Sequence, residues 1–316
     1  MKHAFATALL AGALALGTPA LAADYSIMAP AGPGGGWDQT ARAMQEALTS
    51  AGISANVQVN NVPGAGGTIG LAQFAQEANG DPSRLIVGGY VMVGAILTNK
   101  SPVTLDQVTP IARLTGEYEV IVVPAASDLK TLADLAARLK ADPGAVSWAG
   151  GSAGGTDHIT AGLFAKTVGV DPRAVNYVAF SGGGEALAAV LGAQTTVGIS
   201  GYGEFQAQVE AGALRVLGVS APERIAVIDG PTFKEGGVDL TVMNWRMVAA
   251  GPGLSAEQVA AITADVQKMA ESESWKATLA TKGWINTWLA GDEFKAQLAK
   301  EIEATTAVLK DIGLVE

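Results

Sequence analysis

The chain has 316 residues, of which 49% are hydrophobic and 16% are charged. This composition can bury a sizeable core and excludes an intrinsically disordered chain, while the length predicts two α/β domains. The formal net charge of −10 excludes a general binder of nucleic acid or of an anionic membrane. Because cysteine is absent, disulfides, thiolate metal sites, cysteine nucleophiles and a lipid-modified N-terminal cysteine are excluded as well.

Residues 1–22 have the pattern of a secretory signal peptide. Lys2 supplies the positive charge, residues 4–17 form an apolar stretch, and Ala20-Leu21-Ala22 is an A-x-A cleavage site. The apolar stretch is shorter than the roughly 20 residues of a membrane-spanning helix, which argues against an anchor. We therefore expect export to the periplasm and cleavage near Ala22. Cleavage also removes His3 and leaves His158 as the only histidine.

In the first part of the chain, short strands alternate with amphipathic helices. The helical spacing of Trp37, Ala41, Met44 and Leu48 predicts one buried helix face. Thr131 and Asp134 resemble a capping box at the start of a later helix. In chain order, we expect a strand at 25–29, a loop at 30–36, a helix, a strand around 57–59, a loop at 61–67, a helix around 71–78, and strands at 85–87 and 119–123.

The middle of the chain repeats this alternation, and the last third differs from it. Strands are expected at 146–148, 175–180, 196–200 and 214–219, with glycine-rich loops at 150–157 and 181–184 and helices from about 158, 185 and 204. An extended segment at 238–250 precedes a helix opened by Ser255 and Gln258 and a final helix capped by Asp292.

Two series of strand–helix units predict two lobes built on largely parallel sheets. A terminal helical segment often packs back onto the first lobe. We therefore expect one lobe at 23–119 plus 246–316 and the other at 120–245. The two chain crossings between these lobes suggest a hinge.

Four glycine-rich loops each lie between a predicted strand and a helix. Parallel sheets place such loops at the carboxyl ends of the strands, where open α/β sheets bind ligands. Small residues expose backbone N–H groups, and the following helix N-terminus carries a partial positive charge. Together they predict a site for a small anion without lysine or arginine. The alternative is that each glycine only allows a tight turn.

Several side chains near these loops have two possible roles. Asp38 either contacts the ligand or stabilises the first helical turn with Arg42. Trp37 either lines the cleft or joins the core, and His158 either touches the ligand or caps its helix. Tyr90 and Tyr202 each follow a strand at the expected ligand edge, where either could hydrogen-bond a ligand.

Sharper nucleotide and metal motifs are absent from the sequence. None of the four loops contains the lysine of a P-loop, and Ile69 breaks the dinucleotide fingerprint that begins at Gly64. No set of histidine, aspartate and glutamate has metal-ligand spacing. We therefore expect no metal and no cofactor.

The segment Gly150-Gly151-Ser152-Ala153-Gly154 fits the G-x-S-x-G pattern of a hydrolase nucleophile. Hydrolases with that motif take their histidine base from late in the chain. His158 lies only six residues after Ser152, which argues against that mechanism. A secreted hydrolase using Ser152 remains the alternative, and Ser152 is better explained as a hydroxyl donor to a bound carboxylate.

The loops 30–38 and 61–67, with the sequences PAGPGGGWD and NVPGAGG, resemble the paired signature of the substrate-binding proteins of tripartite tricarboxylate transporters. Residues 151–158, 180–185 and 294–314 are similar to later motifs of that family. The resemblance covers essentially the whole predicted mature chain. It implies a two-lobed periplasmic binding-protein fold that closes on its ligand. Trp37 departs from the smaller residue expected there in many members.

The resemblance also implies a function and a set of contacts. The ligand is a small organic acid, such as a di- or tricarboxylate, and one carboxylate is held by the first-lobe loops, partly through water. The partner is a membrane transporter with one large and one small integral subunit. With the residues singled out above, the candidate ligand contacts are Gly34, Gly35, Gly36, Trp37, Asp38, Gly64, Ala65, Gly66, Gly67, Tyr90, Ser152, Gly154, Thr156, Asp157, His158, Ser181, Gly182, Gly183 and Tyr202.

Together these observations predict a non-enzymatic periplasmic receptor that acts as a monomer and delivers an organic acid to a transporter. A ligand-sensing receptor for a signalling system would use the same closed cleft, so the sequence leaves that alternative open.

Overall fold

The computed structural model describes residues 24–181 and 183–316, so the predicted signal peptide and Gly182 lie outside the described residues. The first half of the chain forms β1 (Tyr25–Ala29), α1 (Gly36–Ser50), β2 (Val57–Asn61), α2 (Thr68–Glu77), β3 (Arg84–Gly89), α3 (Tyr90–Thr98), β4 (Thr109–Pro124), α4 (Leu132–Ala141), β5 (Ser147–Gly150) and α5 (Thr156–Thr167). The second half forms β6 (Asn176–Ala179), α6 (Gly183–Leu191), β7 (Val197–Gly201), α7 (Tyr202–Glu210), β8 (Leu214–Val219), β9 (Met243–Ala250), α8 (Ala256–Glu271), α9 (Glu273–Lys282), β10 (Ile285–Ala290) and α10 (Gly291–Asp311).

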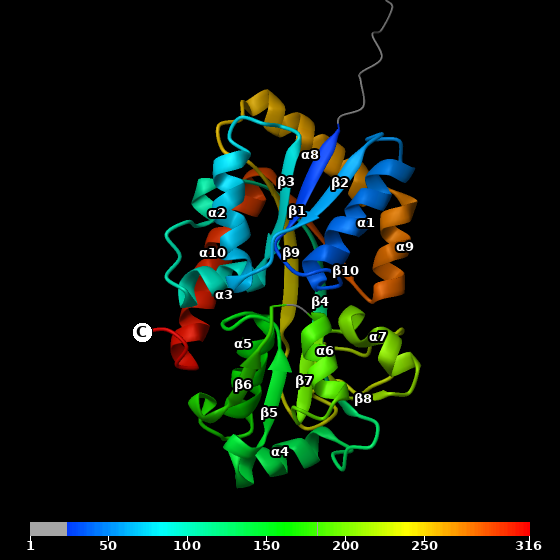
Figure 1. The fold of residues 1–316 in the computed structure, drawn as a ribbon, viewed down its shortest axis with the longest axis vertical. Coiled ribbons are helices and arrows are strands. Elements are labelled where there is room, and N and C mark those ends of the chain that lie inside the picture. The colour runs from blue at the N-terminus through cyan, green and yellow to red at the C-terminus, as the bar shows by residue number, and fades with distance from the viewer. Residues whose placement is uncertain (1–23, 182) are drawn as a thin grey trace, which may run out of the picture.

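The strands form one sheet that passes through two lobes. Its order is β2-β1-β3-β9-β4-β7-β5-β6, and β8 and β10 also pair with β4. Figure 1 shows one lobe built from both ends of the chain and the other from its middle, with β4 and β9 running between them. The two-lobed α/β prediction is therefore confirmed.

The long strand β4 changes partners along its length. Residues 109–118 pair with β9, and residues 119–122 pair with β7. Both pairings are antiparallel, whereas β1, β2 and β3 in one lobe and β5, β6 and β7 in the other pair in parallel. The expectation of largely parallel sheets therefore holds only away from β4, β8, β9 and β10.

Separate hydrophobic clusters fill the two lobes. One combines residues 25–114 with residues 245–298, and includes Phe74, Trp275 and Phe294. Trp148 and Phe164 lie in a second cluster, and Phe205 lies in a third. Each large side chain removed from water contributes about 1.5–3 kcal/mol, so each lobe has its own source of stability.

Several local predictions are confirmed. The helix face of Trp37, Ala41, Met44 and Leu48 is buried. Capping boxes open α4 at Thr131 and α8 at Ser255. The predicted starts of one strand and of the final helix were wrong. The strand at 119–123 begins ten residues earlier, at Thr109, and Asp292 lies in the first turn of α10, whose N-cap is Ala290.

The lobes touch along one side of the cleft. A Cβ added to Gly94 of α3 would collide with the carbonyl oxygen of Gly154, in the loop before α5. The end of α10 also reaches the second lobe, where Asp311 forms an ion pair with Lys166 and Ile312 packs against Gly162. The terminal helix therefore packs on both lobes and not only on the first.

Replacing Gly94 by alanine should hold the lobes apart while leaving each lobe folded. The added methyl group meets the Gly154 carbonyl, and alanine is otherwise favoured over glycine within a helix. We expect small-angle X-ray scattering to show a larger radius of gyration for Gly94→Ala. Gly184→Ala is the control because its Cβ would meet no atom within 4 Å. Equal radii for both variants would contradict the contact.

Candidate functional site

The four glycine-rich loops meet at one cavity between the lobes. The cavity has a volume of about 70 Å³. Its lining includes Gly35, Gly36 and Trp37 at the start of α1, Gly64, Gly66 and Gly67 before α2, Gly151, Ser152, Gly155 and Asp157 around the start of α5, and Ser181 and Gly183 around the start of α6. Ser200, Glu204, Asn244 and Arg246 complete the polar lining.

Several loop amides donate to the protein's own side chains. Gly34 donates to Asp38 Oδ2 at 2.8 Å, Gly151 donates to Asp157 Oδ2 at 2.6 Å, and Gly154 donates to His158 Nδ1 at 3.2 Å. The loops thus present donors to acceptors, as their composition predicts. In the described structure, however, these acceptors belong to the chain itself.

Asp38 stabilises the loop before α1. Its carboxylate accepts hydrogen bonds from Arg42, Asn61 and the Gly34 amide. Burial favours the neutral acid, but the hydrogen bonds from these groups outweigh burial and lower the pKa of Asp38. Asp38 does not line the cavity, so the structure favours first-turn stabilisation.

Trp37 both lines the cavity and joins the core.

His158 caps the loop before its helix. Its Nδ1 accepts from the Gly154 amide, and its ring stacks on Tyr177 with 4.1 Å between ring centroids. Burial lowers the pKa of His158 to about 4, so the ring is neutral near pH 7. Gly154, Thr156 and His158 do not line the cavity.

The remaining candidates do not line the cavity. Tyr90 opens α3 and packs against Trp245, with 6.3 Å between ring centroids. Tyr202 opens α7 and is buried in a hydrophobic cluster. Gly34 and Ala65 belong to loops that reach the cavity but do not line it.

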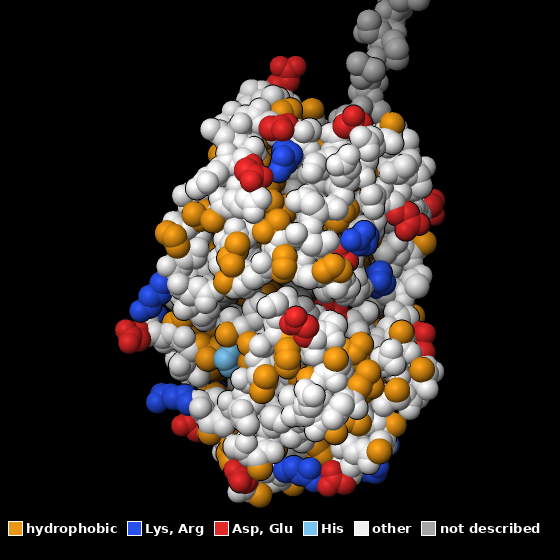
Figure 2. Space-filling model, viewed as in Figure 1, with side chains coloured by type: hydrophobic (Ala, Val, Ile, Leu, Met, Phe, Trp, Pro, Cys, Tyr) orange, Lys and Arg blue, Asp and Glu red, His pale blue; other side chains and the backbone are white. Residues whose placement is uncertain are grey.

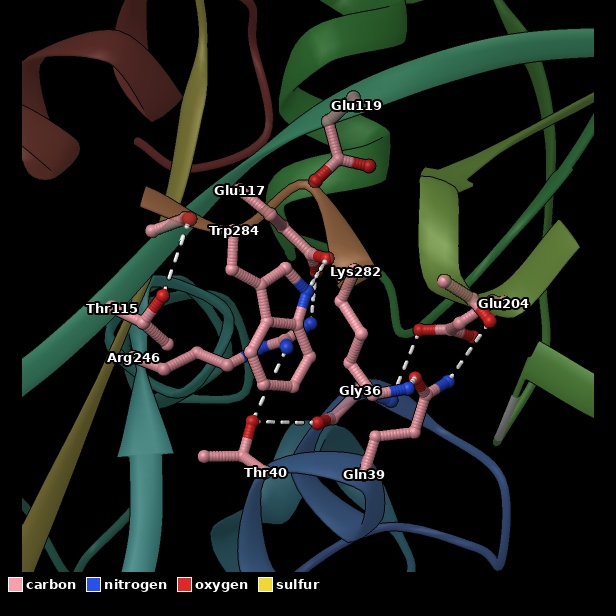
Figure 3. A network of polar contacts seen from close by, with 12 residues as sticks. Gly36, Gln39, Thr40, Thr115, Glu117, Glu119, Glu204, Arg246, Lys282 and Trp284 are labelled. Carbon is pink, nitrogen blue, oxygen red and sulfur yellow. Dashed lines mark hydrogen bonds and ion pairs between the residues drawn. The ribbon is translucent and has the colours of Figure 1, made fainter. Parts of the chain in front are cut away.

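The structure also contains a cluster of charged side chains at the cavity that the sequence analysis did not predict. Arg246 of β9 forms a buried ion pair with Glu117 of β4, and it donates to Thr40 Oγ1 at 3.2 Å. Glu117 Oε2 also accepts from Trp284 Nε1 at 2.8 Å (Figure 3). The Arg246 guanidinium lies 4.9 Å from the centre of the Trp284 ring. These contacts tie α1, β4, β9 and the segment before β10 together.

Glu204 connects the lobes across the cavity. Its Oε1 accepts from the Gly36 amide at 3.0 Å, and Gln39 Nε2 donates to the neighbouring Gly203 carbonyl at 3.3 Å (Figure 3). The Glu204 carboxyl thus accepts the hydrogen bond of the first amide of α1. The sequence analysis expected that amide to donate to a ligand.

The acidic groups have raised pKa values. Desolvation, then the neighbouring Asp157 and Glu117, raises the pKa of Glu204 to about 8. Desolvation raises the pKa of Asp157 to about 6. Glu119 is fully buried, and burial followed by its neighbours Asp157 and Glu117 raises its pKa well above the ordinary value. Two glutamates in an apolar strand, at 117 and 119, were the one sequence signal for this cluster.

Within residues 24–181 and 183–316, no group of His, Asp and Glu side chains is arranged to hold a metal ion. Helices in the same part of the chain are too short or too polar to cross a membrane.

The chain matches the family described as "Tripartite tricarboxylate transporter family receptor" over residues 40–314. It is 25% identical to the protein BugT of Bordetella pertussis over 297 residues, which cover 92% of this chain and 90% of BugT. The family resemblance drawn from the loops is thus confirmed.

Two solved structures share the fold. A Rhodopseudomonas palustris protein solved with adipate has a TM-score of 0.82 at 22% identity, covering 93% of this chain and 98% of its own. MatC of the same organism, solved with bound malate, has a TM-score of 0.76 at 22% identity, covering 93% of this chain and 99% of its own.

Removing the buried arginine should destabilise the protein strongly. Arg246→Met leaves Glu117 buried without its ion-pair partner, which costs about 3–5 kcal/mol. Adding Glu117→Gln to this variant should restore part of the loss, as measured by urea unfolding. The control is Arg224→Met, which breaks an exposed pair with Glu235 and should cost about 1 kcal/mol or less. A similar loss for both single variants would refute the role assigned to Arg246.

Glu204 should make the stability of the protein depend on pH. Its pKa rises from an ordinary 4.5 to about 8 on folding, so between these values the folded protein binds more protons than the unfolded chain. The stability from this shift is complete below pH 4.5 and is lost as the pH rises toward 8.

Glu204→Gln removes that dependence. The free energy of unfolding of the native protein, relative to this variant, should fall by more than about 1 kcal/mol between pH 5 and pH 8, since one pKa unit corresponds to about 1.4 kcal/mol. Urea unfolding of both proteins at the two pH values measures this difference. A difference that stays constant with pH would contradict the assignment.

Proposed function

Because the chain belongs to the family of tripartite tricarboxylate transporter receptors, we propose that it captures a small organic acid between its lobes and delivers it to a membrane transporter. The family is one of periplasmic solute-binding proteins and not of enzymes. The transporter has one large and one small integral subunit. The receptor acts as a monomer after its signal peptide is removed near Ala22.

The observation that carries the proposal is the convergence of four glycine-rich loops on one interlobe cavity. The helices that follow them place several N-termini around the same space, and helix N-termini favour anions. Two structures with the same fold were solved with malate and with adipate, both organic diacids. Those ligands support an organic acid for this chain too.

The change of partners along β4 supports the lobe limits of 23–119 plus 246–316 and 120–245. β4 pairs with β9 through Tyr118 and with β7 from Glu119 onward. Lobe opening would then bend β4 and β9 near this point, and ligand binding would favour the closed arrangement.

The geometry around Ser152 supports a receptor over a hydrolase. A hydrolase needs a histidine that takes the serine proton. His158 Nδ1 instead accepts a hydrogen bond from the Gly154 amide, and the His158 ring stacks on Tyr177. Ser152 lines the cavity, where its hydroxyl can donate to a ligand.

A thermal-shift screen of residues 23–316 against mono-, di- and tricarboxylates tests the proposal. The protein is first unfolded and refolded to remove any ligand carried through purification. An acid at 100 times its dissociation constant adds about 2.7 kcal/mol. At about 2–4 °C for each kcal/mol, or slightly less for a chain of this length, Tm should rise by roughly 4–10 °C.

Ser152→Ala separates the two functions. A receptor keeps a reduced shift with the same acid, whereas a hydrolase loses all turnover of ester substrates. Refolded protein that shifts with no acid would overturn the carboxylate assignment, and ester turnover that depends on Ser152 would replace it.

A further inference from the structure

Glu204 presents one carboxyl oxygen to the cavity. Its side chain lines the cavity from the start of α7 and is half-buried. The Oε1 atom accepts the hydrogen bond of the Gly36 amide at 3.0 Å (Figure 3). Within residues 24–181 and 183–316, the Oε2 atom has no hydrogen-bond partner. Oε2 is therefore the oxygen of this carboxyl group that a ligand in the cavity can contact.

Glycine at position 183 makes room for Oε2. A Cβ added to Gly183, in the first turn of α6, would collide with this oxygen. The carboxyl group of Glu204 thus lies between the start of α1 in one lobe and the start of α6 in the other. Close packing on both sides holds it in one position at the cavity.

The charges around Glu204 are mostly negative. Asp157 of α5 lines the same cavity, and Glu117 and Glu119 of β4 are buried at 4% and 0% exposure. Arg246 of β9 also lines the cavity, but its guanidinium is paired with Glu117. Desolvation and the neighbouring acids outweigh Arg246, since the pKa of Glu204 rises to about 8. At neutral pH this carboxyl group therefore keeps its proton.

The other titratable groups near Glu204 do not change this balance. Lys282 donates to Gln39 Oε1 at 2.9 Å, and burial lowers its pKa. Burial also raises the pKa of the Tyr177 phenol well above its ordinary value, which keeps it neutral. The remaining charged side chains on the helices and strands around Glu204 are paired, exposed or engaged by the backbone: Asp38 with Arg42 on α1, exposed Glu46 and Glu185 on α1 and α6, and Arg215 of β8, which donates to the carbonyls of Ala125 and Leu129.

We propose that Glu204 binds the captured acid as a neutral carboxylic acid, with Oε1 accepting from Gly36 and the Oε2 hydroxyl donating to a carboxylate of the ligand. This inference rests on the proposed function and adds one ligand contact to it. A protonated glutamate has one O–H donor, and its hydrogen bond to a carboxylate is short and strong. An ionised Glu204 would instead oppose the ligand with a like charge.

Capture is then coupled to the proton on Glu204. Well below pH 8 the free receptor already carries this proton, and binding takes up none. Above pH 8 the free carboxylate must take one proton from solvent, which forms the O–H bond and removes one negative charge. Binding therefore weakens as the pH rises, by about tenfold for each unit well above pH 8.

Isothermal titration calorimetry between pH 7 and pH 9 tests the inference. The probes are the mono-, di- and tricarboxylates of the thermal-shift screen, malate and adipate among them, whose carboxyl groups ordinarily ionise below this range. For each acid that binds, Kd should rise about tenfold from pH 7 to pH 9, because the protonated fraction of Glu204 falls from about 0.9 to about 0.1.

Proton uptake gives a second readout of the same titrations. Buffers with different ionisation enthalpies should report about 0.9 proton taken up per ligand at pH 9 and about 0.1 at pH 7. An acid that binds with the same Kd at both pH values and takes up no proton would overturn this inference and leave the proposed function standing.

Two variants of Glu204 assign the proton to this residue. In Glu204→Gln the amide oxygen can still accept from Gly36, and the NH₂ group can donate to the ligand at any pH. This variant should bind nearly as tightly as the native protein at pH 7 and keep that affinity at pH 9. Glu204→Ala should weaken binding by about tenfold or more at pH 7, because it loses a hydrogen bond to a charged group.

A Glu204→Gln variant that retains the native pH profile would overturn the inference, and so would a Glu204→Ala variant with native affinity. Lys282→Gln is the matched control, because the pKa of this nearby lysine is also displaced toward this range. It should keep the native profile, as should Glu210→Gln at the exposed end of α7. A profile lost in Lys282→Gln but kept in Glu204→Gln would assign the proton to the lysine instead.

Failure of the proposed function gives a different result. Refolded native protein and Glu204→Gln that bind none of the acids at pH 7 would overturn the proposed function, and this inference with it.

Discussion

The buried ion pair between Arg246 and Glu117 is the constraint on which the junction of the lobes depends. It joins the two strands that run between the lobes, while Thr40 and Trp284 bring α1 and the segment before β10 to the same pair. A buried pair of this kind is stable only when additional hydrogen bonds satisfy its remaining atoms. The polar contacts at this pair therefore hold α1, β4, β9 and the segment before β10 together beside the cavity.

The elements that could be predicted from the sequence are those with strong local signals. The Trp37–Leu48 helix face and the capping box at Thr131 follow from spacing within a few residues. The glycine-rich loops lie at one cavity because parallel strands bring their carboxyl ends together. The extent of β4 was missed because its polar and apolar residues alternate only in part, and its partners lie far along the chain.

The candidate site was predicted less completely for the same reason. A glycine-rich loop predicts exposed backbone amides, but the loop sequence does not indicate which distant side chain will accept their hydrogen bonds. Glu204 lies 168 residues from Gly36, and Arg246 lies 129 residues from Glu117. Such contacts depend on the packing of the whole chain. Tyr90 and Tyr202 were expected at the cavity because each follows a strand. Both instead pack against a hydrophobic core.

The hydrogen bond from the Gly36 amide to Glu204 also sets a threshold for selectivity. A dissolved anion that sought this amide would have to displace an acceptor attached to the same molecule. Tethered groups compete at effective concentrations that reach the millimolar range. Weakly bound or scarce anions therefore leave the bond in place, and only a solute that offers further contacts elsewhere in the cavity can displace it. The receptor thus carries its own competitor for any small anion that reaches the Gly36 amide.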